Sequence, residues 1–267
     1  MNIIRIEASD DPRAAGFRDI RERDLTGRQG LFVAEGEVVL RVLLSPASLC
    51  RPRAVLLAEN RLAGLADVLA GLPPGVPVYV APQATLDGIA GFHLHRGVLA
   101  LGEKPPAVPL AERLARLPER ALVVLACGIG NHDNMGGIFR NAAAFGADAV
   151  LLDRHCCDPF YRKAIRVSVG AVVRTPMVAG LEAADAVEAL KAAGFAVLAM
   201  TPSAHLALGQ GAPGAPGGGG LGAEGPGLPE DLIARCTPVG IRMSGGFDSL
   251  NVGTAGAIAL HHFARRA

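Results

Sequence analysis

Hydrophobic and polar positions follow two different spacings along the chain. Short apolar runs of strand length are separated by longer stretches in which apolar residues recur at helical intervals. Continuous apolar strands between helices are typical of largely parallel sheets covered on both faces, so the pattern predicts an α/β fold. Strands are expected over residues 31–36, 53–59, 76–81, 96–102, 121–127, 147–153, 172–178, 195–200 and 239–243.

One proline-rich and charged segment interrupts this alternation and divides the predicted elements. It covers residues 104–120, where a boundary between domains is expected. The sequence therefore predicts a smaller α/β domain over residues 1–103, a linker over 104–120 and a larger α/β domain over 121–267.

A second segment, residues 209–227, concentrates glycine and proline where the alternation would place another buried strand. It contains a formal G-x-G-x-x-G at Gly209, Gly211 and Gly214. A dinucleotide-binding fingerprint needs a strand before these glycines and a helix after them, and here they run into prolines and further glycines. We therefore reject the fingerprint, which alone would favour a nucleotide-dependent oxidoreductase. No strand is expected in this segment, because glycine and proline weaken strands.

Composition restricts the possible functions. Half of the 267 residues are hydrophobic, and 26 basic residues nearly balance 25 acidic ones. This balance argues against a strongly basic nucleic-acid coat but leaves local basic patches possible. No apolar run reaches the roughly 18 residues of a membrane span, and the N-terminus lacks the apolar core of a signal peptide. We expect a cytoplasmic protein without membrane contact.

The five cysteines are odd in number and irregularly spaced, so they do not form a disulfide framework. His155, Cys156 and Cys157 are adjacent but lack the paired spacing of a zinc site. We expect no metal, and we interpret these cysteines as packing residues.

Candidate functional residues gather in three clusters after the linker. In the first, Asn134 is expected to cap a helix whose buried face carries Ile138, Ala142 and Phe145. Arg140 falls off that face, near the carboxyl edge of the sheet where ligands of α/β proteins bind. A capped helix with a solvated arginine is an equally good interpretation of this cluster alone.

The other two clusters lie nearer the C-terminus. Glu224 stands between glycines in a tight turn within residues 221–232, where a ligand can approach the backbone closely. Residues 241–263 contain Ser249, a natural N-cap for the small-residue helix that follows. A plain turn and a capped core helix would explain both clusters, except for Asn251.

Together, in this order, the three clusters resemble the SpoU (TrmH) family of RNA 2′-O-ribose methyltransferases in the SPOUT superfamily. The family motif N-x-G-x-x-x-R-x-A-x-x-F-G is matched by residues 134–146, L-G-x-E-G-x-G-L by 221–228, and S-L-N-V with its small-residue helix by 249–260. Residues 158–178 look like the family's K-x-S-x-G-A region. The resemblance covers roughly residues 120–267.

The resemblance implies a trefoil-knotted domain of mostly parallel strands with helices on both faces. Residues 30–44 and 95–101 resemble, more loosely, the ribosomal-protein-like RNA-binding domain that many members carry before it. The SpoU resemblance further implies a homodimer with RNA as substrate. It also implies S-adenosyl-L-methionine bound by backbone groups near Gly222, Ile241 and Leu250.

Carried over residue by residue, the family's catalytic set falls on Asn134, Arg140, Glu224, Ser249 and Asn251. A guanidinium with a pKa above about 12 is a poor base. We therefore expect Arg140 to stabilise the developing alkoxide and anchor the adjacent phosphate, while a phosphate oxygen or water takes the proton. Asn134, Ser249 and Asn251 would position RNA and cofactor loops, and Glu224 would orient asparagine or arginine groups.

A basic group, Arg162, Lys163 and Arg166, follows the same region. Charged helix faces are usually only solvated, but beside the expected site we favour contact with RNA phosphates. The extra N-terminal domain favours a structured RNA, ribosomal slightly more than transfer RNA.

Two departures from the family pattern stand out. Glycine and proline occupy the place of the strand that normally leads into L-G-x-E-G, and Arg242 stands where members commonly have proline. The first departure motivates an alternative function, a catalytically silent RNA-binding protein that keeps the SpoU-type fold.

Overall fold

The structure is a computed structural model that describes residues 2–18, 30–210, 217–221, 227–245 and 249–264. The predicted α/β class is confirmed, with two separate sheets. The chain divides into two compact units. Unit 1 contains Met1–Pro106 and Asp158–Arg174, and unit 2 contains Ala107–Cys157 and Thr175–Ala267. This grouping differs from the sequence-based division in that Asp158–Arg174 belongs with the N-terminal residues.

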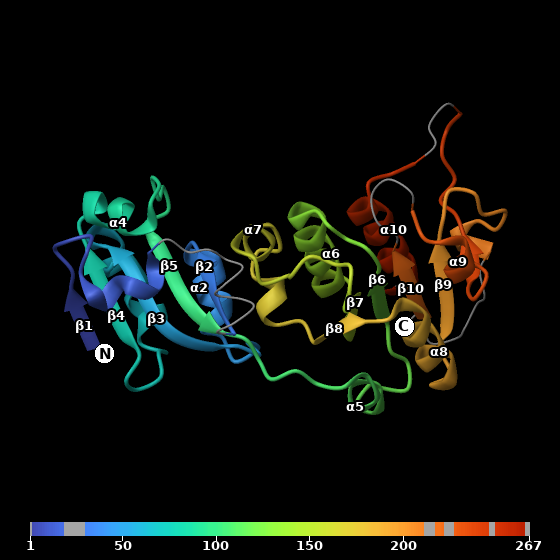
Figure 1. Cartoon of the computed structure of the whole chain (residues 1–267), viewed down its shortest axis with the longest axis horizontal. Coiled ribbons are helices and arrows are strands. Elements are labelled where there is room, and N and C mark those ends of the chain that lie inside the picture. The colour runs from blue at the N-terminus through green and yellow to red at the C-terminus, as the bar shows by residue number, and fades with distance from the viewer. Residues whose placement is uncertain (1, 19–29, 211–216, 222–226, 246–248, 265–267) are drawn as a thin grey trace. The chain divides into compact units, whose positions relative to one another are not determined.

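Unit 1 contains a five-stranded mixed sheet (Figure 1). Its order is β1 (Asn2–Arg5), β4 (Pro77–Ala81), β3 (Arg51–Ala58), β5 (Val98–Glu103) and β2 (Leu31–Glu35), with β5 antiparallel to both neighbours. Its helices and 3-10 turns are η1 (Pro12–Phe17), α2 (Glu37–Leu43), η2 (Glu59–Arg61), η3 (Ala63–Leu65), α3 (Ala66–Leu69), α4 (Gln83–Ala90), α7 (Arg162–Val167) and η4 (Ala171–Val173). The strand β1 was not predicted, because it is short and largely exposed.

Phe32 of β2 makes two close contacts in unit 1, one with the neighbouring strand β5 and one with the segment Asp158–Arg174. Phe32 lies opposite Gly102 across β2 and β5, and a Cβ at Gly102 would meet the Phe32 ring at 2.3 Å. Glycine therefore lets the ring lie directly on the neighbouring strand. The ring centroid of Phe32 also lies 5.1 Å from that of Phe160 in the segment Asp158–Arg174.

Unit 2 contains a six-stranded sheet in which every pair is parallel. Its order is β11 (Thr237–Val239), β9 (Ala196–Met200), β10 (Gly217–Leu221), β6 (Val123–Ala126), β7 (Ala149–Asp153) and β8 (Met177–Leu181). Its helices and turn are α5 (Leu110–Ala115), α6 (His132–Ala144), α8 (Ala183–Ala192), η5 (Leu208–Gln210), α9 (Glu230–Ile233) and α10 (Val252–Ala264).

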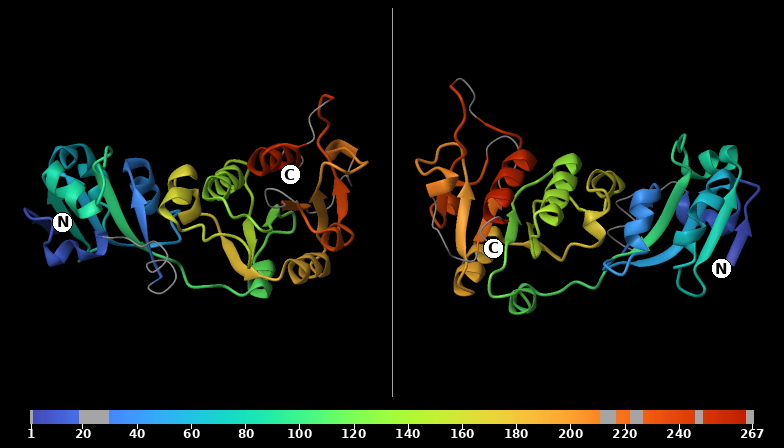
Figure 2. Two further views of the ribbon diagram at one scale, coloured as in Figure 1. Left: turned by 45° about the horizontal axis from the view of Figure 1, so that its top comes forward. Right: turned by 180° about the vertical axis from the view of Figure 1, so that it is seen from behind.

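Helices cover both faces of this sheet because successive strand residues point to opposite sides. On one face, Val197 and Leu125 join a core with Leu190 of α8. On the other face, Leu198 joins a smaller core with Ala259 of α10. The helices α6 and α10 lie side by side (Figures 1 and 2).

The expectation that the glycine and proline segment lacks a strand is wrong. Residues 217–221 form β10, which pairs in parallel with β9 on one side and β6 on the other. Glycine carries the same backbone donor and acceptor as other residues, so two flanking strands can fix it despite its conformational freedom. Side-chain patterns cannot predict such a strand, because its position is fixed by backbone pairing with the two neighbouring strands.

Two other strand predictions are wrong in part. Residues 171–173 form the turn η4, closed by a hydrogen bond from the Val173 amide to the Gly170 carbonyl, so β8 begins only at Met177. The predicted strand 239–243 overlaps β11 only at Val239. Gly240 forms an isolated parallel bridge with Ala207, and residues 241–242 continue as irregular backbone that borders a cavity described below.

Candidate functional site

The candidate site lies in unit 2 at the carboxyl ends of the parallel strands. The helix α6 begins shortly after β6, and residues 240–242 follow β11. Ligands of α/β sheets bind outside this edge, particularly where the strand order reverses. Here the chain runs outward from β6 through β7 and β8, and then returns to place β9, β10 and β11 on the other side of β6.

A hydrogen bond between two predicted site residues joins the beginnings of α6 and α10. The Asn251 amide nitrogen donates to the Asn134 side-chain oxygen at 2.8 Å. Asn134 is buried, with 7% of its surface exposed. The structure therefore brings together two residues that are 117 positions apart.

Both N-cap predictions are wrong by a few residues. The side-chain oxygen of Asn251, not Ser249, accepts from the backbone amides of Gly253 and Thr254 at 2.9 and 3.2 Å. In the same way Asn131, not Asn134, accepts from the first amides of α6. Several residues near each helix start have capping side chains, and the helix boundary decides which one is used.

A third asparagine, missed by the sequence analysis, makes a further contact between these helices. The Asn141 amide nitrogen donates to the backbone oxygen of Gly253 at 2.9 Å. We call Asn134, Asn141 and Asn251 the asparagine cluster. The available signal was spacing: Asn141 follows Asn134 by seven residues, which returns a side chain to the same face of a helix.

Arg140 lies on the opposite, solvent-facing part of α6, as the sequence predicted. Its side chain is exposed, whereas Ile138 and Ala142 are 1% and 0% exposed. Within the described part of the chain, Arg140 has no hydrogen bond or ion pair. Its guanidinium is therefore available to an anion from outside the protein.

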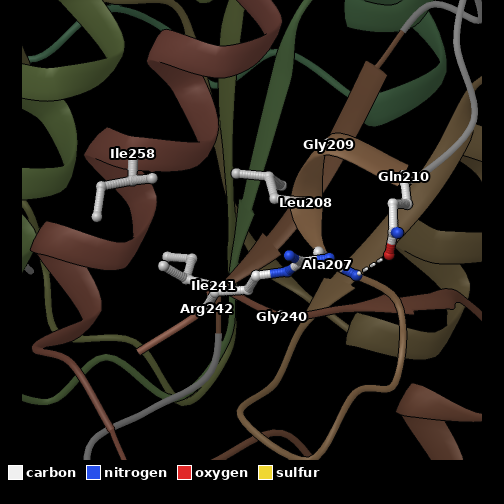
Figure 3. Close-up of a pocket in the computed structure, with 8 residues that line it drawn as sticks. All are labelled: Ala207, Leu208, Gly209, Gln210, Gly240, Ile241, Arg242 and Ile258. Atoms are coloured by element: carbon white, nitrogen blue, oxygen red, sulfur yellow. Dashed lines mark hydrogen bonds between the residues drawn. The ribbon is translucent and has the colours of Figure 1, made fainter. Parts of the chain in front are cut away.

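A cavity of about 430 Å³ opens beside β11 (Figure 3). It is lined by Ala207, Leu208, Gly209, Gln210, Gly240, Ile241, Arg242 and Ile258. Of the predicted cofactor residues, Ile241 therefore lines the cavity, while Leu250 is 40% exposed and does not. Gly222 and Glu224 lie outside the described residues, and Ser249 is exposed.

This cavity suits a nucleoside-sized cofactor. Its volume falls in the range of small-molecule sites, about 300–1,000 Å³. Leu208, Ile241 and Ile258 provide apolar walls. Among the described residues, the backbone N–H groups of Ile241 and Arg242 have no partner, so they remain available for ring or ribose oxygens and nitrogens.

The basic group on α7 is partly engaged inside unit 1. The guanidinium groups of Arg162 and Arg166 lie 3.7 and 3.5 Å from a carboxylate oxygen of Glu35, whose side chain is 8% exposed. Arg162 also lies over the Phe92 ring, 4.3 Å from its centroid. A buried carboxylate needs such cations, because it would otherwise be left uncompensated. Lys163 is exposed.

Cys127 and Cys156 are protonated packing residues. Burial raises the pKa of Cys127 and of Cys156 to about 12, and the Cys156 thiol donates to the Ala126 carbonyl. The described residues contain no group of three or more side chains placed to hold a metal ion. Nor does any described helix have the length and hydropathy to span a membrane.

Comparison with known proteins agrees with this geometry. Residues 121–261 match the model of the SpoU rRNA Methylase family. A Mycobacterium bovis protein named as an uncharacterised tRNA/rRNA methyltransferase is 40% identical over 266 residues, which are 96% of this chain and 90% of that protein.

Solved structures resemble the chain over nearly its whole length. An RNA 2′-O ribose methyltransferase is 28% identical, with a TM-score of 0.78 over 98% of this chain and 99% of its own. The SpoU methyltransferase AviRb of Streptomyces viridochromogenes, in complex with AdoMet, shares the fold at 24% identity, with a TM-score of 0.78 over 96% of this chain and 98% of its own. The resemblance inferred from the three motifs is confirmed, and the chain belongs to the SpoU rRNA methylase family.

Proposed function

We propose that the protein transfers a methyl group from S-adenosyl-L-methionine to a ribose 2′-hydroxyl of a structured RNA. The observation that carries this proposal is the hydrogen bond between Asn251 and Asn134, because it joins the first and third family motifs at the ligand-binding edge of the sheet. The 28% identical RNA 2′-O ribose methyltransferase, alike over the full chain, supports the ribose as target.

The cofactor would lie in the cavity beside β11, where it supplies an electrophilic methyl group. Leu208, Ile241 and Ile258 would hold its adenosine by apolar contact, and the free backbone amides of Ile241 and Arg242 would donate to it. Gly222 and Leu250 complete the cofactor set that we propose from the family motifs.

Arg140 would act on the RNA rather than on the cofactor. Its exposed guanidinium can hold the phosphate next to the reacting ribose and stabilise charge that develops on the 2′-oxygen. As the 2′-oxygen would take the methyl group, the carbon–sulfur bond would break to leave S-adenosylhomocysteine. The hydroxyl proton would pass to a phosphate oxygen or water, since the guanidinium stays protonated. Asn134 and Asn251 would keep the loops in place, with Ser249 and Glu224 completing the site.

The wider assembly is part of the proposal. We infer a trefoil knot in unit 2, a homodimer that completes the active site, a cytoplasmic location and an RNA-binding role for unit 1. Ribosomal RNA is slightly favoured over transfer RNA. Lys163 would contact phosphates directly. Arg162 and Arg166 would do so with their outer edges, because each already lies near Glu35.

The catalytically silent alternative loses its main motivation. It arose because glycines occupy the place of a central strand, and these glycines pair with both neighbouring strands. A methyl-transfer assay distinguishes the two functions. The full chain is incubated with methyl-tritiated S-adenosyl-L-methionine and with ribosomal or transfer RNA, and digested nucleosides are identified by mass spectrometry.

We expect a 2′-O-methylated nucleoside from the wild type and from Arg120→Ala, a matched change at another exposed arginine. Arg140→Ala should abolish most of the product. Methyl transfer to a base would overturn the ribose assignment. RNA binding without any transfer would favour the silent protein.

A further inference from the structure

Arg242 gives the cavity beside β11 a positive charge. It is the sole charged residue among the eight described residues that line the cavity. In the view of Figure 3 its side chain extends from the Ile241 side of the cavity toward Ala207. Within the described part of the chain, the Arg242 guanidinium has no hydrogen bond or ion pair.

The surroundings of this guanidinium suit an anionic ligand group. Leu208, Ile241 and Ile258 offer it no polar atom on their side chains, and Gln210 turns its amide oxygen to the Ala207 backbone amide at 3.2 Å. An arginine that borders apolar walls without a carboxylate can bind a planar anion through two parallel hydrogen bonds.

The inference rests on the proposed function and extends it to one group of the cofactor. S-adenosyl-L-methionine carries a sulfonium, an ammonium and a carboxylate. Arg242 would repel the two cations and attract the carboxylate, so charge alone selects how the amino-acid tail can lie. We propose that Arg242 binds the α-carboxylate of S-adenosyl-L-methionine and thereby holds its methionine tail.

The position in the cavity favours this ligand over an RNA phosphate. Both arginines are exposed, but Arg242 lines the cavity together with the apolar residues that would hold adenosine, whereas Arg140 projects from a helix face. Members of the family commonly have proline where this chain has Arg242, and proline would provide neither charge nor donor. The proposal therefore concerns this chain in particular.

Calorimetric titration of the full-length protein tests the proposal with three ligands. S-adenosylhomocysteine has the carboxylate and the ammonium. Its decarboxylated analogue keeps the ammonium, and 5′-methylthioadenosine lacks the whole tail. The variants are Arg242→Met, which keeps length without charge, Arg242→Lys, and the control Arg120→Met at an exposed arginine far along the sequence.

We expect Arg242→Met to weaken S-adenosylhomocysteine binding about tenfold or more, the range of charged hydrogen bonds, and Arg242→Lys to weaken it less. Binding of the decarboxylated analogue and of 5′-methylthioadenosine should stay within about twofold, or strengthen for the cationic analogue. The Arg120→Met control should match the wild type. Circular dichroism of each variant monitors folding, and Arg242→Gln replaces any variant that does not fold.

Other outcomes separate the possible failures. Equal weakening of all three ligands would overturn the carboxylate assignment and make Arg242 a part of the cavity wall. Unchanged S-adenosylhomocysteine binding with weaker RNA retention would assign Arg242 to a phosphate instead. If the wild type binds none of the ligands, the proposed function itself fails, and this inference fails with it.

Discussion

The asparagine cluster and the two arginines that we propose for ligand binding, Arg140 and Arg242, differ in how their polar groups are satisfied at one edge of the same sheet. Asn134, Asn141 and Asn251 are neutral, and their amide groups bond to each other or to the backbone of α10. Arg140 and Arg242 are charged and have no partner among the described residues. The amides of the cluster are thus satisfied within the protein, whereas the two guanidinium groups that we propose for ligands have no partner in the described part of the chain.

This difference predicts two kinds of variant. Loss of an asparagine should lower stability, because a neutral hydrogen bond contributes about 0.5–1.5 kcal/mol and an N-cap about 1 kcal/mol. Loss of an arginine should leave stability nearly unchanged, since exposed charges without partners contribute little to folding. Activity and ligand binding should show the reverse order.

The largest effect is expected for Arg140→Ala. Methyl transfer should fall about 100-fold to 1,000-fold, the usual cost of removing a group that stabilises transition-state charge. The melting temperature should stay within about 1 °C of wild type, because the side chain has no partner to lose among the described residues.

Single-turnover rates at saturating cofactor and RNA, with a thermal melt of the same sample, measure both quantities. Arg140→Lys should remain well below wild type, because an ammonium cannot make two parallel hydrogen bonds to phosphate. Nearly full turnover in the lysine variant would contradict that role.

The next largest effect is expected for Asn251→Ala. It removes the cap of α10 and the hydrogen bond to the buried Asn134 together. The free energy of unfolding should fall by about 1–3 kcal/mol, and turnover should fall with it. Urea denaturation measures the first quantity. Asn251→Asp retains the capping oxygen but not the donor, so it should recover only part of the lost stability.

A smaller loss is expected for Asn141→Ala. The variant leaves the Gly253 carbonyl without its side-chain donor, which should cost about 0.5–1.5 kcal/mol. Affinity for S-adenosylhomocysteine should be unchanged, because Asn141 does not line the cavity. A calorimetric titration that shows weaker binding at unchanged stability would contradict the assignment of stability to the asparagine cluster and of ligand binding to the cavity.

The smallest effect is expected for Gly240→Ala. An added Cβ would lie 3.2 Å from the Thr201 carbonyl oxygen, closer than an ordinary contact, so the backbone beside the cavity must shift slightly. We expect S-adenosylhomocysteine binding to weaken a few-fold, with little change in melting temperature, since the strain is local. Gly245→Ala is the matched control, because no described atom lies within 4 Å of its added Cβ.

Apolar patterns predicted the strands that contain branched side chains, such as β6 and β7, because burial on both faces fixes their composition. They could not predict β10, whose glycines show no pattern and are fixed by β9 and β6. The same limit affected α7. Its basic residues suggested a phosphate surface, but both of its arginines lie beside Glu35, which is more than a hundred residues away in the sequence.

The catalytic motifs were more predictable than the local contacts of their residues. The family motifs predicted Asn134, Arg140 and Asn251 as site residues, and the structure brings Asn134 and Asn251 into contact. The motifs did not identify which asparagine caps which helix. That choice depends on where hydrogen bonding begins, and a shift of two or three residues moves a side chain from the helix end to its buried face.

Unit 1 is built from two separate parts of the chain, and this restricts how its gene can recombine. A gene fragment that ends after Pro106 would encode Phe32 and Glu35 without Phe160, Arg162 and Arg166, and so leave an aromatic ring and a buried carboxylate uncovered. Recombination that exchanges only the first part of the gene would therefore combine mismatched halves of one core. The N-terminal residues and the rest of the chain are therefore expected to be inherited together, although the chain divides into two compact units.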